Sequence, residues 1–121
     1  MTDVCIERRK FPRKLVSLGC HLQLGSGVMV SGNTHDISQE GAGVEAQPLA
    51  NHQQNITPKA GDLGMLILRY NNRGTAGSMK IHCRVVHTLA NRIGLYLFYS
   101  RLSKLDKQNM DMILETALDN I

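Results

Sequence analysis

Apolar and polar residues alternate in several short runs of this chain, and this alternation constrains the fold more than any other feature. In the first run, residues 16–24, every second side chain is apolar (Val16, Leu18, Cys20, Leu22, Leu24). A period of two is typical of a β-strand with one buried face. Apolar runs bounded by turn or loop residues predict further strands at 28–35, 41–46, 63–70, 79–85 and 93–99. The chain is therefore predicted to be mainly β, with six short antiparallel strands.

Six strands in a chain of 121 residues most economically close into a barrel, because closure removes exposed sheet edges. The periodicity changes after the last strand. Ser103 followed by Asp106 is a capping-box pattern, and the apolar residues beyond it recur at helical spacing. We predict a single domain over residues 15–121, a six-stranded antiparallel barrel with an α-helix over about 103–119 that covers an opening or flank of the barrel.

A basic segment precedes the first strand. Residues 1–14 have no apolar periodicity and are predicted to form a flexible arm. If the arm is extended, Arg9 and Arg13 point to one side with Cα atoms about 13 Å apart, and Arg8 points to the other. Guanidinium groups bind phosphates and purine edges in a bidentate manner, so this spacing suits a rigid anionic ligand. A solvated basic tail remains the alternative for this segment taken alone.

The charge distribution and the cysteines narrow the function further. The net charge is +4, and residues 1–14 carry five cations against two acids, which leaves about +1 for the rest. A local positive field favours one anionic ligand over a long nucleic-acid track. The longest apolar runs are too short to cross a membrane, and no signal peptide is evident, so we expect no membrane insertion. Three cysteines without CxxC spacing favour the reducing cytoplasm.

A second motif lies between the predicted second and third strands, where the sequence reads Asp36-Ile37-Ser38-Gln39-Glu40-Gly41. The Asp36 and Ser38 side chains can bond nearby backbone N–H groups and Gly41 permits a positive φ, which describes a turn. The same residues also suit a binding site. An outward carboxylate can accept from the N–H donors of guanine, Ser38 can add a polar contact, and Gly41 can let a ligand approach the backbone.

Together the two motifs resemble the PilZ family, whose signature is RxxxR in an N-terminal arm followed by (D/N)xSxxG on a small barrel. Here these are Arg9-Lys10-Phe11-Pro12-Arg13 and residues 36–41, in the family's order. The resemblance implies a PilZ-type barrel and a bacterial receptor for cyclic di-GMP, a cytoplasmic second messenger. It also implies a ligand site at Arg8, Arg9, Arg13, Asp36, Ser38 and Gly41. A stacking residue late in the fifth strand is implied too, at His87, whose parity with Val85 otherwise makes it a core-facing histidine.

The sequence agrees less well with other functions. A single-stranded nucleic-acid-binding OB-like barrel is the main alternative, but Trp is absent and alternation splits Tyr96, Phe98 and Tyr99 between two faces. No motif of an enzyme appears. Cysteine and histidine are adjacent in two places, Cys20-His21 and His82-Cys83. Neighbouring residues on a strand point to opposite faces, so neither pair can bind one metal ion, and no metal site or cofactor is expected. An adaptor that has lost ligand binding is disfavoured by the intact motifs. A lone receptor domain must signal through a protein partner, which the sequence does not identify.

Overall fold

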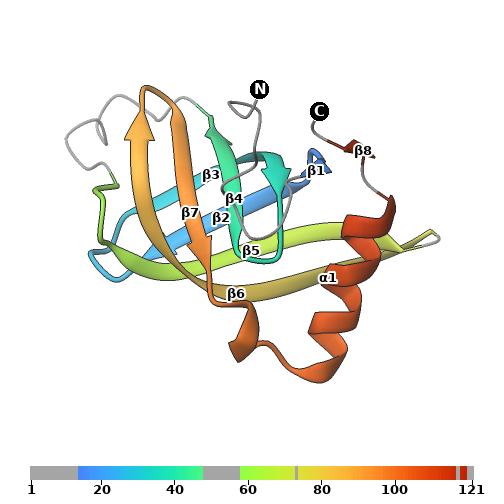
Figure 1. Cartoon of the computed structure of the whole chain (residues 1–121). Coiled ribbons are helices and arrows are strands. Elements are labelled where there is room, and N and C mark those ends of the chain that lie inside the picture. Colours follow the sequence, from blue (N-terminus) through green and yellow to red (C-terminus); the bar gives the residue numbers. More distant parts are fainter. Residues whose placement is uncertain (1–13, 48–57, 73, 117, 120–121) are drawn as a thin grey trace, which may run out of the picture.

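The computed structural model describes residues 14–47, 58–72, 74–116 and 118–119, and most of these residues lie in strands (Figure 1). The strands are β1 (Lys14–Leu15), β2 (Gly19–Leu24), β3 (Met29–Ile37), β4 (Gly41–Ala46), β5 (Leu63–Asn72), β6 (Thr75–Leu89), β7 (Arg92–Leu97) and β8 (Leu118–Asp119). A short 3-10 helix, η3 (Tyr99–Arg101), leads from β7 to the single α-helix, α1 (Lys104–Thr116).

Six of the strands form a closed antiparallel barrel. Their order is β2-β5-β6-β7-β4-β3, and β3 pairs back onto β2. The predicted mainly β fold, a six-stranded antiparallel barrel with a C-terminal helix, is therefore confirmed. Two strands of two residues each were not predicted: β1 pairs with β3, and β8 pairs with β1. They are too short to show any periodicity.

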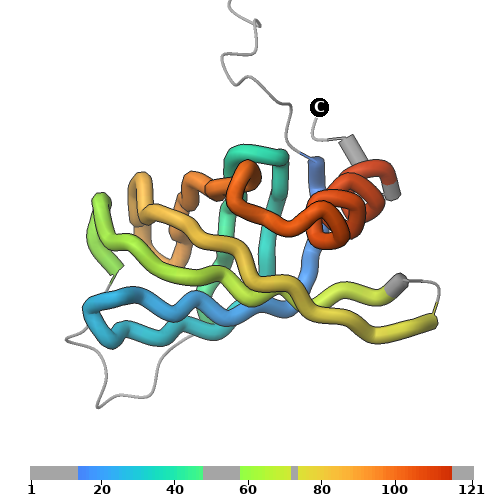
Figure 2. Tube along the Cα trace, turned by 90° about the horizontal axis from the view of Figure 1, so that it is seen from below, coloured from blue at the N-terminus to red at the C-terminus, as the bar shows by residue number. Residues whose placement is uncertain are grey.

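The alternating apolar side chains point into the barrel, as the sequence predicted. In β2 the exposed fractions of Cys20, Leu22 and Leu24 are 3%, 0% and 6%. The helix α1 lies against the barrel (Figures 1 and 2) and adds Met110 and Ile113 to the same buried cluster. The amphipathic pattern of residues 103–119 thus predicted the packing of the helix, although the helix itself runs from residue 104 to residue 116.

Several strand boundaries differ from the prediction: β5 and β6 extend to Leu63–Asn72 and Thr75–Leu89, and β7 is Arg92–Leu97 rather than 93–99. Two further differences bear on the site. The first barrel strand begins at Gly19 rather than Val16. Before Gly19, the buried Thr34 side chain takes the place of regular strand pairing, because its hydroxyl accepts from the Leu18 N–H at 2.8 Å and donates to the Val16 carbonyl. The next strand continues to Ile37 rather than ending at His35. Asp36 therefore lies within a strand and not in the turn that follows it.

Two β-bulges interrupt the alternation. One lies between Thr34 and Asp36 in β3, and the other lies between Val85 and His87 in β6. A bulge inserts one unpaired residue, so side chains beyond it exchange faces relative to a simple count by two. Asp36 and His87 both follow such a bulge, and both consequently lie on the outer face of the barrel.

Candidate functional site

The two bulges bring four residues into one row across four adjacent strands. Asp36 of β3 pairs with Gly43 of β4, Gly43 pairs with Gly94 of β7, and Gly94 pairs with His87 of β6. Adjacent strands are about 4.8 Å apart, so the row is about 14 Å long. We call this row the glycine shelf. It has two glycines in the middle, with a carboxylate that leans over one of them and an imidazole that leans over the other.

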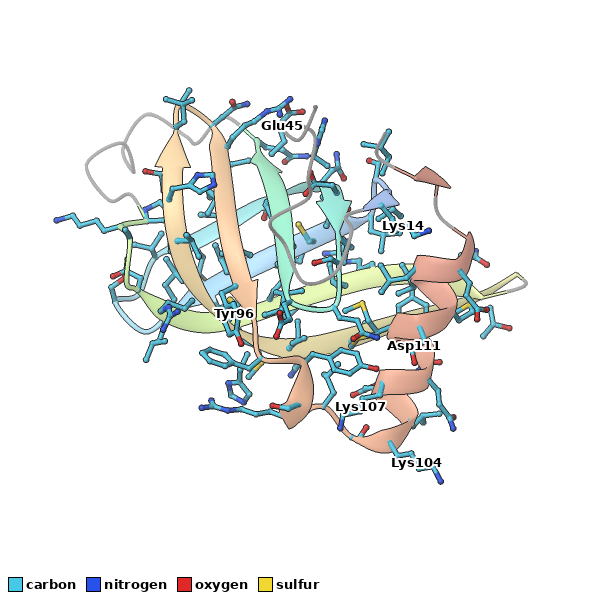
Figure 3. The ribbon with its side chains drawn as sticks, viewed as in Figure 1. Lys14, Glu45, Tyr96, Lys104, Lys107 and Asp111 are labelled. Carbon is cyan, nitrogen blue, oxygen red and sulfur yellow. The ribbon has the colours of Figure 1, made fainter. Side chains whose placement is uncertain are left out.

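Each glycine of the shelf is required by the side chain beside it. A Cβ atom at Gly43 would lie 2.8 Å from Oδ1 of Asp36, and one at Gly94 would clash with the His87 ring. The Asp36 and His87 side chains therefore lean over the glycines. By the register of β4 and β7, the next outward rows on either side of the shelf contain Tyr96 and Glu45, which are labelled in Figure 3. The Asp36 carboxylate thus covers Gly43 and the His87 ring covers Gly94.

Asp36 is held in place by its neighbours. Its Oδ1 accepts a hydrogen bond from the Gly43 N–H at 3.0 Å, and its Oδ2 lies 3.5 Å from Nδ1 of His35. Only 12% of its side chain is exposed. A carboxylate offers about four acceptor positions, so one that already accepts from the backbone can still accept further donors. The carboxylate is thus oriented before any ligand arrives.

Ser38 and Gly41 shape the turn that joins β3 to β4. The Ser38 N–H donates to the Gly41 carbonyl at 2.7 Å, and the buried Ser38 Oγ accepts from the Glu40 N–H at 3.3 Å. The predicted turn is therefore present. The positive φ considered for Gly41 is wrong: positive φ angles among described residues occur at Gly27, Gly61, Gly74 and Ala90. Gly41 instead begins β4 opposite Tyr96.

The orientation expected for His87 from its parity with Val85 is also wrong. Val85 is 1% exposed, but the bulge places Val86 on the surface and turns His87 outward. His87 is exposed and lies over Gly94. It is neither a core histidine nor an inward residue at the barrel mouth. The correction brings the ring into the same row as Asp36, where a surface-bound ligand can reach both.

The predicted arm residues Arg8, Arg9 and Arg13 lie outside the described residues. The chain enters the described region at Lys14, which begins β1 rather than closing the arm, and Leu15 pairs directly with Asp36. Residues span at most about 3.6 Å each, so the Cα of Arg13 is within about 7 Å of that of Leu15 and the Cα of Arg9 within about 22 Å. The pairing of β1 with β3 therefore tethers the first motif to the second.

The shelf was only partly visible in the sequence. Glycines at 41 and 43 in a predicted strand indicate that another backbone or a ligand comes close to that strand. The sequence gives no comparable indication that Gly94 belongs to the same site. Its signal is a glycine in the middle of the apolar run from Ile93 to Leu97. That glycine gains a role only once the register places it beside Gly43.

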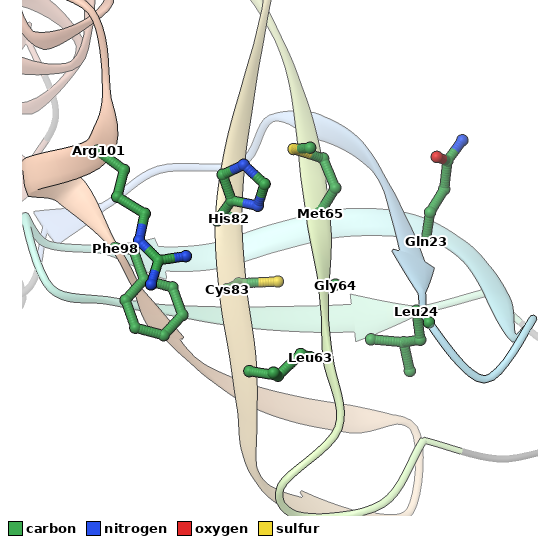
Figure 4. A pocket seen from close by; sticks show the side chains of 10 residues that line it. Gln23, Leu24, Leu63, Gly64, Met65, His82, Cys83, Phe98 and Arg101 are labelled. Atoms are coloured by element: carbon green, nitrogen blue, oxygen red, sulfur yellow. The ribbon is translucent and has the colours of Figure 1, made fainter.

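The barrel also carries a pocket of about 440 Å³, away from the shelf (Figure 4). It lies over β2, β5 and β6 and shares no residue with the shelf. Its lining combines apolar side chains with histidine and arginine and contains no acidic residue (Gln23, Leu24, Gly25, Leu63, Gly64, Met65, His82, Cys83, Phe98, Arg101).

The aromatic residues do not form an open stacking platform. The rings of Tyr96 and Phe98 meet edge to face with centroids 5.1 Å apart. The Arg84 guanidinium lies 5.4 Å from the Tyr96 centroid and that of Arg101 lies 4.4 Å from the Phe98 centroid. Guanidinium groups thus occupy ring faces on which bases would have to stack in a single-stranded nucleic-acid complex.

One serine–histidine contact raises the question of hydrolytic chemistry. Ser31 Oγ lies 2.8 Å from Nδ1 of His21, and the Arg69 guanidinium contacts Nε2 of the same ring. A guanidinium can only donate, so Nε2 accepts and Nδ1 carries the proton that it donates to Ser31. His21 in this tautomer cannot take the Ser31 proton through Nδ1. In the ranges that the structure describes, no group of three His, Cys, Asp or Glu side chains could hold a metal ion.

Comparisons with known proteins identify the fold. The sequence model of one family, described as PilZ domain, matches residues 7–116. The chain belongs to the PilZ domain family. The match covers both motifs and all of the barrel, so the resemblance noted from the sequence is confirmed. Curated protein sequences give no significant match. No helix in the described part of this PilZ chain is long and apolar enough to cross a membrane.

Solved structures of PilZ proteins are similar to this chain. The inhibitor of motility MotI/DgrA of Bacillus subtilis has a TM-score of 0.68 at 18% identity, covering 91% of this chain and 50% of that chain. This PilZ chain thus spans half the length of that protein. The PilZ domain of YcgR from Escherichia coli, solved with c-di-GMP, has a TM-score of 0.66 at 12% identity and covers 91% of both chains. The PilZ domain of CeSA from a cellulose-synthesizing bacterium scores 0.53 at 15% identity, covering 85% of this chain and 95% of that domain.

Proposed function

We propose that this PilZ protein is a cytoplasmic receptor for cyclic di-GMP that changes conformation when the dinucleotide binds and passes the signal to a partner protein. The single observation that carries the proposal is the pairing of Leu15 with Asp36. Since the arginine motif directly precedes this pairing in the sequence, it can reach the carboxylate end of the glycine shelf. The PilZ domain of YcgR, which has the same fold, was solved with c-di-GMP. The proposed receptor is not an enzyme, needs no cofactor, does not insert into a membrane and binds no specific nucleic acid.

The chemistry of the ligand matches the groups of the site. Cyclic di-GMP carries two phosphate charges and two guanines. Guanine offers O6 and N7 as acceptors on one edge, and arginine is the side chain that contacts them in a bidentate manner. Its N1–H and N2–H donors require an acceptor, and the Asp36 carboxylate at the end of the shelf is a suitable one. In this assignment Arg8, Arg9 and Arg13 bind phosphates and guanine edges.

The remaining site residues have supporting roles. The absence of a side chain at Gly43 and Gly94 leaves room for the Asp36 carboxylate and the His87 ring, which a purine at the shelf would contact. At the opposite end from Asp36, the exposed ring of His87 can contact the face of the base. Ser38 and Gly41 fix the turn beside Asp36, and Ser38 can contribute a polar contact if the turn adjusts on binding.

The switch in this proposal is the basic arm. By its sequence, the basic part of the arm, residues 7–13, holds like charges at Arg8, Arg9, Lys10 and Arg13 and one large apolar side chain, Phe11, so ordering it has little to offset the entropy cost. A dianion that bridges the arm to Asp36 removes this repulsion and adds hydrogen bonds. Binding would then fold residues 1–13 across the barrel and create a new surface for the partner.

Single substitutions test the proposal. Arg9→Ala and Arg13→Ala should each weaken cyclic di-GMP binding at least about tenfold, because charge-assisted bidentate contacts are lost. Lys80→Ala is the matched control: it removes the same charge from an exposed position on β6 away from the shelf. It should change the affinity by less than about twofold, since exposed charges are screened by salt. Equal losses for Lys80→Ala and Arg9→Ala would show that only net charge matters.

Asp36→Ala separates recognition from electrostatics. Removing the carboxylate makes the site more positive, so electrostatics alone predicts tighter binding of the dianion. Recognition of the guanine N–H donors predicts weaker binding instead. Titration of the Asp36→Ala variant with cyclic di-GMP decides between them, and tighter binding would contradict the role assigned to Asp36.

A further inference from the structure

The turn of the second motif is bound to the C-terminal helix by a side-chain contact. Gln39, which lies between Ser38 and Gly41, donates from Nε2 to Oδ1 of Asp111 on α1 at 3.3 Å. The Tyr99 hydroxyl, from η3, donates to the same oxygen at 3.0 Å. One carboxylate oxygen therefore joins three parts of the chain: the turn, the 3-10 helix and α1. Figure 3 shows Asp111 on the stretch of α1 that lies against the barrel.

Both sides of this contact are fixed independently. Met110, the neighbour of Asp111, is 0% exposed, and Ile113 is 4% exposed, so this part of α1 is anchored in the core. On the other side, the Glu40 carbonyl accepts from the Leu97 N–H at 3.0 Å, which holds the turn against the end of β7. The Gln39 side chain spans the two.

Tyr99 stays a donor at neutral pH. Partial burial, the hydrogen bond to Asp111 and the Asp111 charge all raise the pKa of the Tyr99 hydroxyl above its usual range. The protonated hydroxyl therefore keeps Oδ1 of Asp111 oriented toward the place where Gln39 reaches it.

We propose that Asp111 is a positioning residue for the ligand site: through Gln39 it sets the orientation of the Ser38–Gly41 turn and couples α1 to the glycine shelf. The effect on ligand binding presupposes the cyclic di-GMP site proposed above. By linkage, a partner that displaces α1 lowers the affinity for the ligand, and the ligand in turn stabilises α1 by the same factor. Ligand binding at the shelf can thus affect a partner protein through α1 as well as through the arm.

A double-mutant cycle tests the coupling. Asp111→Ala and Gln39→Ala should each weaken cyclic di-GMP binding about fivefold, a coupling of typical size. The double variant should bind no more weakly than either single variant, because both changes break the same bond. Asp111→Asn, which keeps an acceptor oxygen, should recover most of the affinity. Additive losses in the double variant would overturn the proposal.

A control separates positioning from a general loss of helix stability. Ser103→Ala removes the hydrogen bond from the Asp106 N–H to Ser103 Oγ, 3.1 Å long, at the start of α1. It weakens the first turn of the helix, about two turns away from Asp111. Its affinity for cyclic di-GMP should stay within about twofold of the wild type. An equal loss in Ser103→Ala and Asp111→Ala would show that helix stability, and not the contact with Gln39, is responsible.

Amide exchange of the ligand-free protein tests the coupling between the turn and α1 independently of whether the protein binds cyclic di-GMP. The amides of Glu40 and Gly41 should exchange at least about threefold faster in Gln39→Ala and Asp111→Ala than in the wild type, while that of Ile81 in the core should not change. If the wild type fails to bind cyclic di-GMP, the proposed function is wrong, and the exchange rates still decide the coupling. If the wild type binds and both variants bind equally well, the positioning role is wrong and the function stands.

Discussion

The substitution Gly43→Ala tests the shelf with a single methyl group. The new Cβ would lie 2.8 Å from Oδ1 of Asp36, below the 3.0 Å that real Cβ contacts essentially always exceed. To reach 3.4 Å, an ordinary contact distance, the oxygen has to retreat by about 0.6 Å or rotate away. Its hydrogen bond from the Gly43 N–H, now 3.0 Å long, would then be lost or strongly weakened.

The expected magnitudes follow from this displacement. Loss of a hydrogen bond to a charged group costs about 1.5–3 kcal/mol of stability, and replacing Gly by Ala returns about 0.4–1 kcal/mol through the unfolded chain. We therefore expect the free energy of unfolding to fall by about 1–2 kcal/mol. A displaced carboxylate also loses its paired contact with guanine, worth about 1–3 kcal/mol, which corresponds to about 5- to 150-fold in the dissociation constant.

Calorimetric titration with cyclic di-GMP and urea denaturation measure the two effects. Gly77→Ala is the matched control, because its Cβ would lie 2.8 Å from the Tyr70 ring in the β5–β6 hairpin, away from the shelf. This control should lose a similar amount of stability and keep its affinity for the ligand. Unchanged affinity in Gly43→Ala, or an equal loss in Gly77→Ala, would refute the role assigned to the shelf.

Three further predictions concern other parts of the chain. His87→Ala should weaken cyclic di-GMP binding about fivefold or more through lost stacking, while His87→Phe should bind within about twofold of the wild type in the same titration. Burial raises the pKa of the Cys83 thiol from 9.0, its value in the unfolded chain, to about 12. The buried neutral thiol therefore stabilises the folded state fully below pH 9.0, and this stabilisation is lost as the pH rises from 9.0 towards 12. Urea denaturation should accordingly show Cys83 contributing about 2 kcal/mol less at pH 10.5 than at pH 8, and Cys83→Ala should flatten this slope. Finally, amide exchange of residues 5–13 should be near the unprotected limit without ligand and much slower with it, while slow exchange in the free protein would mean that the switch lies elsewhere.

The barrel could be predicted from the sequence because the pattern that indicates each strand lies within a few consecutive residues. Alternation within each run of five to ten residues sets which face of a strand is buried, as in β2, where Cys20 and Leu22 point inward as predicted. Closure then follows from six strands in a short chain. The change of period after Ser103 likewise predicted the helix, whose apolar residues Met110 and Ile113 are buried.

The shelf could not be predicted in full because it depends on pairings between distant segments. Counting by two places His87 on the inner face, and a single bulged residue, Val86, reverses that assignment without any warning in the local pattern. The two-residue strand β1 shows no periodicity, yet it brings the chain beside Asp36. Asp36 and Ser38 could be proposed as candidates from the sequence because their chemistry can be recognised without a register.

Titration calorimetry of the wild-type protein with cyclic di-GMP, and separately with cyclic di-AMP, tests the central claim most directly. Adenine has neither the O6 acceptor nor the N2 donors of guanine, so it cannot engage the arginines and Asp36 in the same way. We predict saturable binding of cyclic di-GMP with a dissociation constant near or somewhat below about 1 μM, and binding of cyclic di-AMP at least about tenfold weaker. Absence of cyclic di-GMP binding, or equal affinity for the two dinucleotides, would contradict the account.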